Sequence, residues 1–274
     1  MSYPPGYTDL VERGERAALS IARAQRLEIE KTELIYFGCN VTIRLHPHNI
    51  VARFSGRAAK FSSHVAARTR EMEVSRYLAD ADAPVVSPSN IIDAGPYEEE
   101  GLMISFWKFF VEGDIDQRKI AALADYPGEL PFLHGYADAR RLFMQYWREG
   151  ELTEEEFRET LGRISEMDIA LAIMKEEMNA PPVPLHGDSH LRNTLCVGTL
   201  ENPKILWIDW EDVCCGPVEW DYACLLVNLY DFPDRNEHHI ANMKAAIADH
   251  TDPDRLELLI KARELQIDIW DGIP

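Results

Sequence analysis

HGDSHLRN at residues 186–193 and ILWIDWED at residues 205–212 are the two segments from which the architecture of this chain can be predicted. Asp188 and Asn193 lie in the first segment, and Asp209 follows sixteen residues after Asn193, at the end of an apolar run. One loop thus carries a carboxylate and an amide, and the hairpin that follows carries a second carboxylate. Phosphoryl transfer needs this set, because one carboxylate orients the attacking hydroxyl, while an amide oxygen and a carboxylate hold the Mg²⁺ that bridges the phosphates.

The composition limits the classes of function. The 274 residues carry a formal net charge of −19, and such a surface repels nucleic acid and anionic lipid, so neither is expected as a partner. No apolar run approaches the roughly 18 residues that span a bilayer, and the acidic, Pro-containing start does not resemble a signal peptide. The five cysteines show no metal-ligand spacing, so we expect reduced, mostly buried thiols in a cytoplasmic protein.

The order of the expected elements predicts two lobes. Helices are expected at residues 8–30 and 63–80, with strands at 33–44, 49–54 and 101–112. The remainder is mainly helical, with helices at 136–149, 153–179, 218–230, 236–250 and 253–267 and short strands at 195–197 and 205–210. We therefore predict an α+β chain with a β-rich N-terminal nucleotide-binding lobe at 1–107, a helical C-terminal lobe at 108–274, and a ligand cleft between them.

The two motifs resemble those of a known family. HGDSHLRN, then IDWED, Gly216-Pro217 and Trp220-Asp221 resemble the aminoglycoside phosphotransferase and choline kinase family, which is similar in fold to protein kinases. The family pattern is H-x-D-x-x-x-x-N, followed by a hydrophobic-Asp segment. The resemblance implies a two-lobed, protein-kinase-like transferase that moves phosphate from ATP, with Mg²⁺, to a hydroxyl of a small molecule.

The resemblance also implies roles for individual residues. It makes Asp188 the catalytic base, and Asn193 and Asp209 the Mg²⁺ ligands. It makes Asp221 a structural acid that braces the loop, and His186 a structural residue rather than a chemical one. His190 and Arg192 lie inside the same loop and are left without a role.

The N-terminal lobe offers a weaker nucleotide site. Residues 36–41 form a candidate phosphate loop around Gly38 and Asn40, although a single glycine between strands also suits an ordinary hairpin turn. Period-2 alternation puts Val51 and Arg53 on one face of their strand, where Val51 is expected to contact adenine and Arg53 phosphate. Arg44 is the competing phosphate cation.

The same resemblance implies two further nucleotide contacts. Glu71 matches the helix acid that pairs with the phosphate cation, and the backbone from Ser105 to Lys108 matches the interlobe linker that hydrogen-bonds adenine. The predicted nucleotide-binding residues are Gly38, Asn40, Val51, Arg53, Glu71, Ser105 and Trp107.

Several questions stay open at this point. The acceptor is an aminoglycoside or other antibiotic, an amino alcohol or a sugar, and the net charge favours a cationic one. The acids expected to meet such a cation are Glu211, Asp212, Asp231, Asp234, Asp268 and Asp271, with Trp270 between the last two. One alternative is a nucleotide-binding module of the same fold without catalysis, and another is a metallohydrolase that uses His186, Asp188 and His190 as ligands.

Overall fold

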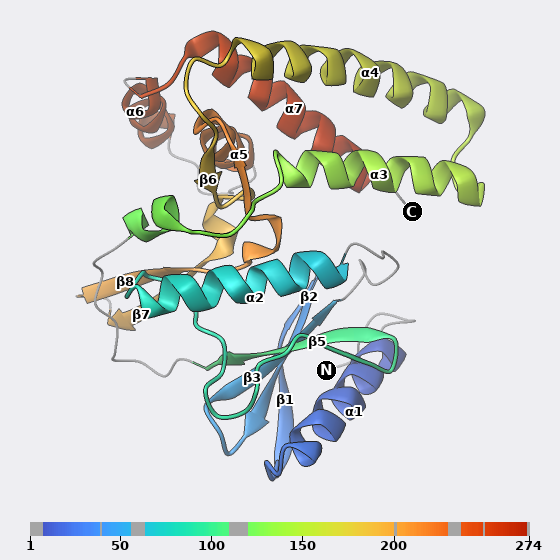
Figure 1. The fold of residues 1–274 in the computed structure, drawn as a ribbon. Helices are drawn as coiled ribbons and strands as arrows, with labels where there is room; N and C mark the ends of the chain where they lie inside the picture. The colour runs from blue at the N-terminus through green and yellow to red at the C-terminus, as the bar shows by residue number, and fades with distance from the viewer. Residues whose placement is uncertain are drawn as a thin grey trace. The chain divides into compact units, whose positions relative to one another are not determined.

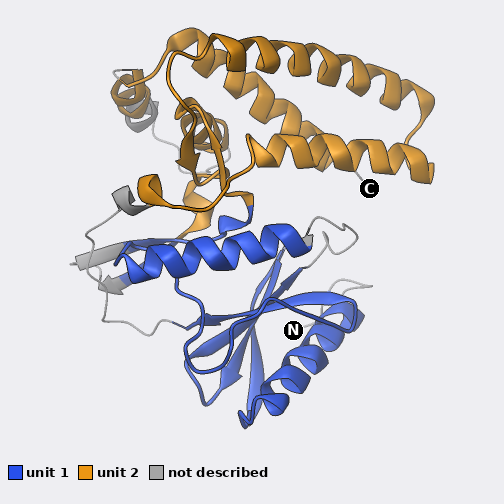
Figure 2. Cartoon of the chain, viewed as in Figure 1, with its two compact units in different colours: residues 1–122, 195–211 blue, residues 123–194, 212–274 orange. Residues whose placement is uncertain are grey.

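The chain forms two compact units. A computed structural model describes residues 8–38, 40–55, 64–109, 120–199, 202–229, 237–248 and 250–272. The first unit consists of residues 1–122 and 195–211, and the second of residues 123–194 and 212–274 (Figure 2). The mixture of one main antiparallel sheet with helices confirms the predicted α+β class.

The first unit is built on a five-stranded antiparallel sheet with the order β1-β2-β3-β5-β4 (Figure 1). The β-rich segment at 33–44 forms two strands that meet at the loop predicted around Gly38, where the Gly38 N–H donates to the carbonyl of Asn40 at 2.9 Å. The strands are β1 (Lys31–Phe37), β2 (Asn40–His46), β3 (Ile50–Ser55), β4 (Tyr97–Glu99) and β5 (Leu102–Lys108). The helices are α1 (Thr8–Ala24) and α2 (His64–Asp80).

The two faces of β3 have different partners, as the period-2 pattern predicts. Ile50, Ala52 and Phe54 belong to a buried apolar cluster shared with α1. Val51, on the other face, packs against Met72 of α2. Arg53 therefore lies on the face that α2 covers.

The hairpin at residues 195–211 is part of the first unit, whereas the prediction placed it in the C-terminal lobe. Its strands are β7 (Thr194–Thr199) and β8 (Asn202–Trp207). The backbone explains the difference, because the Trp207 N–H donates to the carbonyl of Pro84 at 2.8 Å, and the Trp207 carbonyl accepts the N–H of Val86 at 3.2 Å. The boundary predicted after residue 107 also falls inside this unit.

The second unit is a helical bundle in which α7 packs against α3, α4 and α5 (Figure 1). Thr153 and Glu156 form a capping box at the start of α4, and Asp252 caps α7 ahead of Pro253. The fully buried Trp220 and Leu259 lie in its core. The elements are α3 (His134–Glu149), α4 (Glu154–Glu177), β6 (Val183–Leu185), β9 (Cys214–Gly216), α5 (Glu219–Leu229), α6 (Glu237–Ala248) and α7 (Pro253–Asp271), with a short 3-10 turn at Leu191–Asn193. Two more 3-10 turns, Ile120–Asp125 and Trp210–Asp212, span positions where the chain passes from the first unit to the second.

Among the described residues, no helix combines the length and the apolar character that crossing a membrane requires. The described cysteines differ from the expectation in one respect, since Cys196 on β7 is exposed, while Cys214 and Cys224 are buried.

Candidate active site

The loop at residues 186–193 is anchored by Asp221 of α5. The Asp221 carboxylate accepts the backbone N–H groups of His186 and Gly187, each at 2.9 Å. The Trp220 indole N–H donates to the carbonyl of Gly187 at 2.9 Å, and the Ser189 hydroxyl donates to the carbonyl of Asp221 at 2.6 Å. The bracing role predicted for Asp221 is thus confirmed by the contacts.

Gly187 is required at its position for two reasons. Its φ of +87° lies in the left-handed region, which a side chain disfavours. A Cβ atom there would also lie 1.9 Å from the backbone carbonyl oxygen of Asp212. The close approach of these two backbone segments sets the shape of the loop immediately before Asp188.

Asp188 and Asn193 are brought together, as the motif predicts. The Asn193 Nδ2 donates to the carbonyl oxygen of Asp188 and to its Oδ2, each at 2.9 Å. Because both partners are acceptors, the Asn193 amide turns its nitrogen toward Asp188 and its oxygen away. That oxygen is a ligand of the type that Mg²⁺ accepts.

The two histidines of the loop also contact Asp188. The Nδ1 of His190 accepts the N–H of Arg192 at 3.1 Å, so the neutral ring carries its proton on Nε2, which lies 3.3 Å from the Asp188 Oδ2. The buried His186 accepts the Asp188 N–H on Nδ1 at 3.4 Å. Both histidines therefore orient the loop and its acid.

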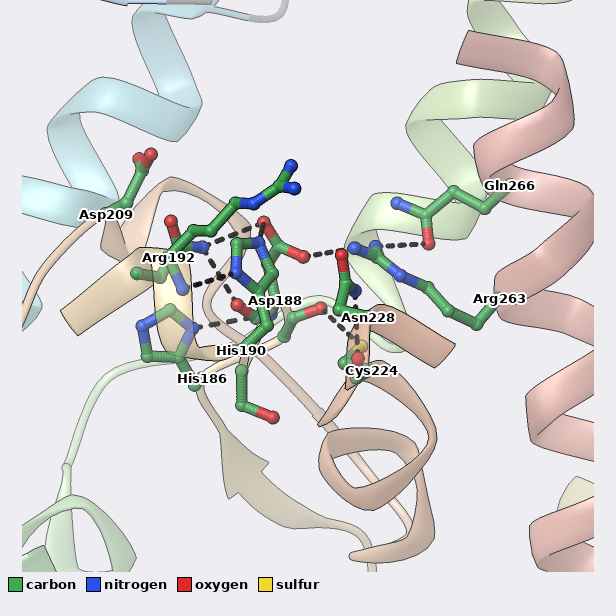
Figure 3. A network of polar contacts seen from close by, with 12 residues as sticks. His186, Asp188, His190, Arg192, Asp209, Cys224, Asn228, Arg263 and Gln266 are labelled. Carbon is green, nitrogen blue, oxygen red and sulfur yellow. Dashed lines mark hydrogen bonds and ion pairs between the residues drawn. The ribbon is translucent and has the colours of Figure 1, made fainter. Parts of the chain in front are cut away.

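Arg263 of α7 is a site residue that the sequence did not indicate (Figure 3). Its Nη2 donates to the Asp188 Oδ1, and its Nη1 donates to the Gln266 Oε1 at 3.0 Å. Burial by itself raises the pKa of the Asp188 carboxyl, but the Arg263 guanidinium and the His190 ring outweigh it and hold that pKa well below its usual range. No motif signals this contact, because the two residues are 75 positions apart in the sequence.

In the first unit, Arg53 connects α2 to the segment that follows β8. Its Nη1 donates to the Glu71 Oε1 at 2.5 Å, and its Nη2 donates to the Asp209 Oδ1. The Glu71 side chain is fully buried and the Arg53 side chain is 12% exposed. The pairing of Glu71 with Arg53 is therefore present, and the planar fork of the arginine holds two acids at once.

A second arginine, Arg68 of α2, was also missed. Its Nη1 donates to the Glu71 Oε2 at 2.9 Å, and its Nη2 bonds to the Asn40 Oδ1 and lies 2.8 Å from the Glu211 Oε2. Burial raises the pKa of Glu211 to about 7, with Arg68 opposing the rise and Asp209 adding to it. Asn40, predicted to face phosphate, is thus held by a buried guanidinium.

The predicted nucleotide contacts on β5 already form hydrogen bonds within the protein. The Trp107 indole N–H donates to the Ser105 hydroxyl at 2.9 Å, and both side chains are buried. The backbone N–H groups of Phe106 and Lys108 donate to the carbonyls of Ala94 and Ser87, so an adenine at this strand would compete with existing bonds.

Arg44, the competing phosphate cation, is the β2 partner of Val51 and lies on the same face of the sheet as Arg53. Its guanidinium carbon is 3.9 Å from the centre of the Phe109 ring, which is a cation–π geometry. Glu71 and Asp209 pair with Arg53, whereas the Arg44 guanidinium contacts an aromatic ring.

The hydrolase alternative required a metal cluster. Among the residues that the structure describes, no group of three or more His, Cys, Asp or Glu side chains is placed to hold a metal ion.

A sequence model of the phosphotransferase enzyme family matches residues 117–259, which is just over half of the chain. The chain belongs to this family. No curated protein sequence matches it. The matched range of the phosphotransferase contains Asp188, Asn193, Asp209 and Asp221, and it ends before Arg263.

The fold of this chain is similar to those of several solved phosphotransferase and kinase structures. The phosphotransferase is similar to the aminoglycoside phosphotransferase APH(3'')-Id from Streptomyces rimosus, with a TM-score of 0.64, 17% identity, and coverage of 94% of this chain and 98% of that one. It is also similar to the amicoumacin kinase hAmiN, with a TM-score of 0.59, 12% identity, and coverage of 96% and 88%. A choline/ethanolamine kinase family protein from Mesorhizobium loti gives a TM-score of 0.55, 15% identity, and coverage of 93% and 84%. These similarities confirm the predicted kinase-like fold.

Proposed function

We propose that this protein is a kinase that transfers the γ-phosphate of ATP to a hydroxyl group of a small molecule. The observation that carries the proposal is the Asp188–Asn193 pair, in which one amide both holds the carboxylate and turns its own oxygen away from it. Membership of the phosphotransferase enzyme family supports the reaction class.

Asp188 is the proposed base. Its carboxylate accepts the hydrogen bond of the attacking hydroxyl, and it takes that proton as the new P–O bond forms and the bond to the ADP leaving group breaks. A carboxylate with a lowered pKa is a weak base. Phosphoryl transfer tolerates a weak base, because its loose transition state needs orientation and charge stabilisation more than early removal of the proton.

The donor set suits Mg²⁺, which prefers amide, carboxylate and phosphate oxygens. We propose the Asn193 Oδ1 and the Asp209 carboxylate as its protein ligands. A bound ion would supply positive charge that offsets the charge of the phosphates.

The first unit supplies the proposed nucleotide contacts. Arg53 is favoured over Arg44 as the phosphate cation, because Glu71 and Asp209 hold its fork while Arg44 stacks on Phe109. The further contacts stay as predicted: Gly38, Asn40, Val51, Ser105 and Trp107. Solved relatives hold AMP-PNP with Ca²⁺ in one case and ADP in another, which supports a nucleotide with a divalent ion.

The acceptor is proposed from the same relatives and from charge. Their names include streptomycin, kanamycin and spectinomycin, together with a choline/ethanolamine kinase family, so an antibiotic or an amino alcohol is the class to test. A cationic acceptor remains our proposal, although two of the predicted acids already have partners: Glu211 pairs with Arg68, and Asp268 pairs with Arg163 at 2.5 Å. Asp231 and Asp234 lie outside the described residues.

The test is a screen of hydroxyl compounds for ATP consumption, with Asp188→Asn as the matched control. We expect at least one acceptor for the native protein and a loss of turnover of about 10²-fold or more in the variant, with ATP binding nearly unchanged. Tight Mg·ATP binding without turnover on any compound would instead favour the catalytically silent module. Native-like turnover in the variant would remove Asp188 from the role of base.

We also propose that the protein acts in the cytoplasm. The four cysteines within the described ranges are free thiols, as a reducing compartment favours.

A further inference from the structure

The carboxylate of Asp188 is held on both oxygens. Its Oδ2 receives the Asn193 Nδ2 at 2.9 Å and lies 3.3 Å from the His190 Nε2, while its Oδ1 receives the Arg263 Nη2 (Figure 3). Donors on one oxygen alone would leave the carboxylate plane to rotate, because the terminal torsion of an aspartate is broad. The bond from α7 removes that rotation.

We propose that Arg263 is a positioning residue that fixes the carboxylate of Asp188 for the attacking hydroxyl. The inference rests on the proposed kinase function. A carboxylate offers about four lone-pair sites, and the three donors named above occupy three of them. One site is left for the hydroxyl of the acceptor.

The exposed fractions of the two side chains show that Arg263 is buried more deeply than Asp188. The Arg263 side chain is 7% exposed, and that of Asp188 is 21% exposed. The guanidinium thus lies on the protein side of the carboxylate, and the accessible side of the carboxylate remains for the acceptor. An arginine in direct contact with solvent would compete with the acceptor for that side.

Arg263 is itself held in place by buried partners. Gln266, three positions further along α7 and 2% exposed, accepts from the Arg263 Nη1 at 3.0 Å. At the start of α3, a Cβ on Gly135 would lie 2.6 Å from the Gln266 Nε2, so the glycine leaves the room that the amide occupies. The packing of α3 against α7 therefore reaches Asp188 through two side chains.

Asp188 lies inside the range matched by the family model, and Arg263 lies four positions beyond the end of that range at residue 259.

The first experiment compares Arg263→Ala and Arg263→Lys with Arg255→Ala in the same helix. Arg255 forms an ion pair of similar kind with the buried Glu219 at 3.2 Å, away from Asp188, so it controls for the loss of a charge pair from α7. We expect Arg263→Ala to lower kcat by about 10²-fold, the scale of a small displacement of a reacting group, with the KM for ATP nearly unchanged. The kcat of Arg263→Lys should lie between that of Arg263→Ala and that of the native protein, because an ammonium group keeps the charge without the planar fork of the guanidinium. Arg255→Ala should keep its kcat.

The second experiment separates positioning from folding. Millimolar guanidinium ion should restore part of the activity of Arg263→Ala and none of that of Asp188→Asn. In the Asp188→Asn background, Arg263→Ala should have little further effect on kcat, because residues that act as a unit are strongly non-additive.

The outcomes distinguish the two proposals. An inactive native protein overturns the proposed function and this inference with it. If the native protein is active, three results would each overturn the role of Arg263 alone. These are a native kcat in Arg263→Ala, additive effects of Arg263→Ala and Asp188→Asn on kcat, and a loss of activity in Arg255→Ala as large as that in Arg263→Ala.

Discussion

Glu71→Gln is the most direct test of the charge cluster in the first unit. The native carboxylate is fully buried, with Oε1 2.5 Å from the Arg53 Nη1 and Oε2 2.9 Å from the Arg68 Nη1. Glutamine keeps the size and one acceptor oxygen, but it removes the charge and turns an NH₂ group toward one guanidinium. Breaking a buried ion pair costs about 3–5 kcal/mol, since the remaining charge stays buried.

The lower end of that range applies here, because each arginine keeps another acid. Arg53 still has Asp209, and Arg68 still has Glu211. We therefore expect a loss of about 3 kcal/mol in the free energy of unfolding. For a protein of this size, a loss of about 3 kcal/mol corresponds to a fall in Tm of roughly 6–12 °C.

The assay is thermal and urea unfolding of the variant beside Glu257→Gln. Glu257 pairs with Lys261 at 2.7 Å on the exposed face of α7, and such pairs contribute little, so its loss should leave Tm unchanged. A loss below about 1 kcal/mol in Glu71→Gln, within the range of ordinary substitutions, would refute the buried two-arginine cluster.

Four further substitutions test the site. Asp209→Ala should abolish the divalent-ion dependence of ATP binding in calorimetry, because the ion carries the largest local charge there; unchanged Mg²⁺-dependent affinity would contradict its role as a ligand. Arg53→Ala should raise the KM for ATP strongly while Arg44→Ala changes it little, and the reverse result would move the phosphate cation to Arg44. Gly187→Ala should destabilise the protein and abolish activity, since its Cβ meets the carbonyl oxygen of Asp212 at 1.9 Å and its φ is +87°; a Tm and activity like those of the native protein would show that the loop shifts at little cost.

Local patterns were sufficient for most of the fold. The helices α2, α3, α4 and α7 lie within a few residues of their predicted ranges, because apolar periodicity and caps such as Thr153 and Asp252 act over a few positions. Within the β-rich segment at 33–44, the loop predicted around Gly38 separates β1 from β2. The hairpin at 195–211 was placed with the wrong unit, because backbone bonds to residues 84–86 cannot be read from either segment alone.

In the site, the contacts that lie within one motif could be predicted from residue spacing. Asp188 and Asn193 are five positions apart on one loop, so their spacing alone brings the amide to the carboxylate. The contact of Arg263 with Asp188, and the binding of both Arg68 and Arg53 to Glu71, depend instead on which elements pack together in three dimensions. The physical reason is that a buried charge takes its partner from whichever element packs beside it. The sequence patterns of α7 and α2 mark neither Arg263 nor Arg68 as buried, and they do not specify which acid each arginine meets.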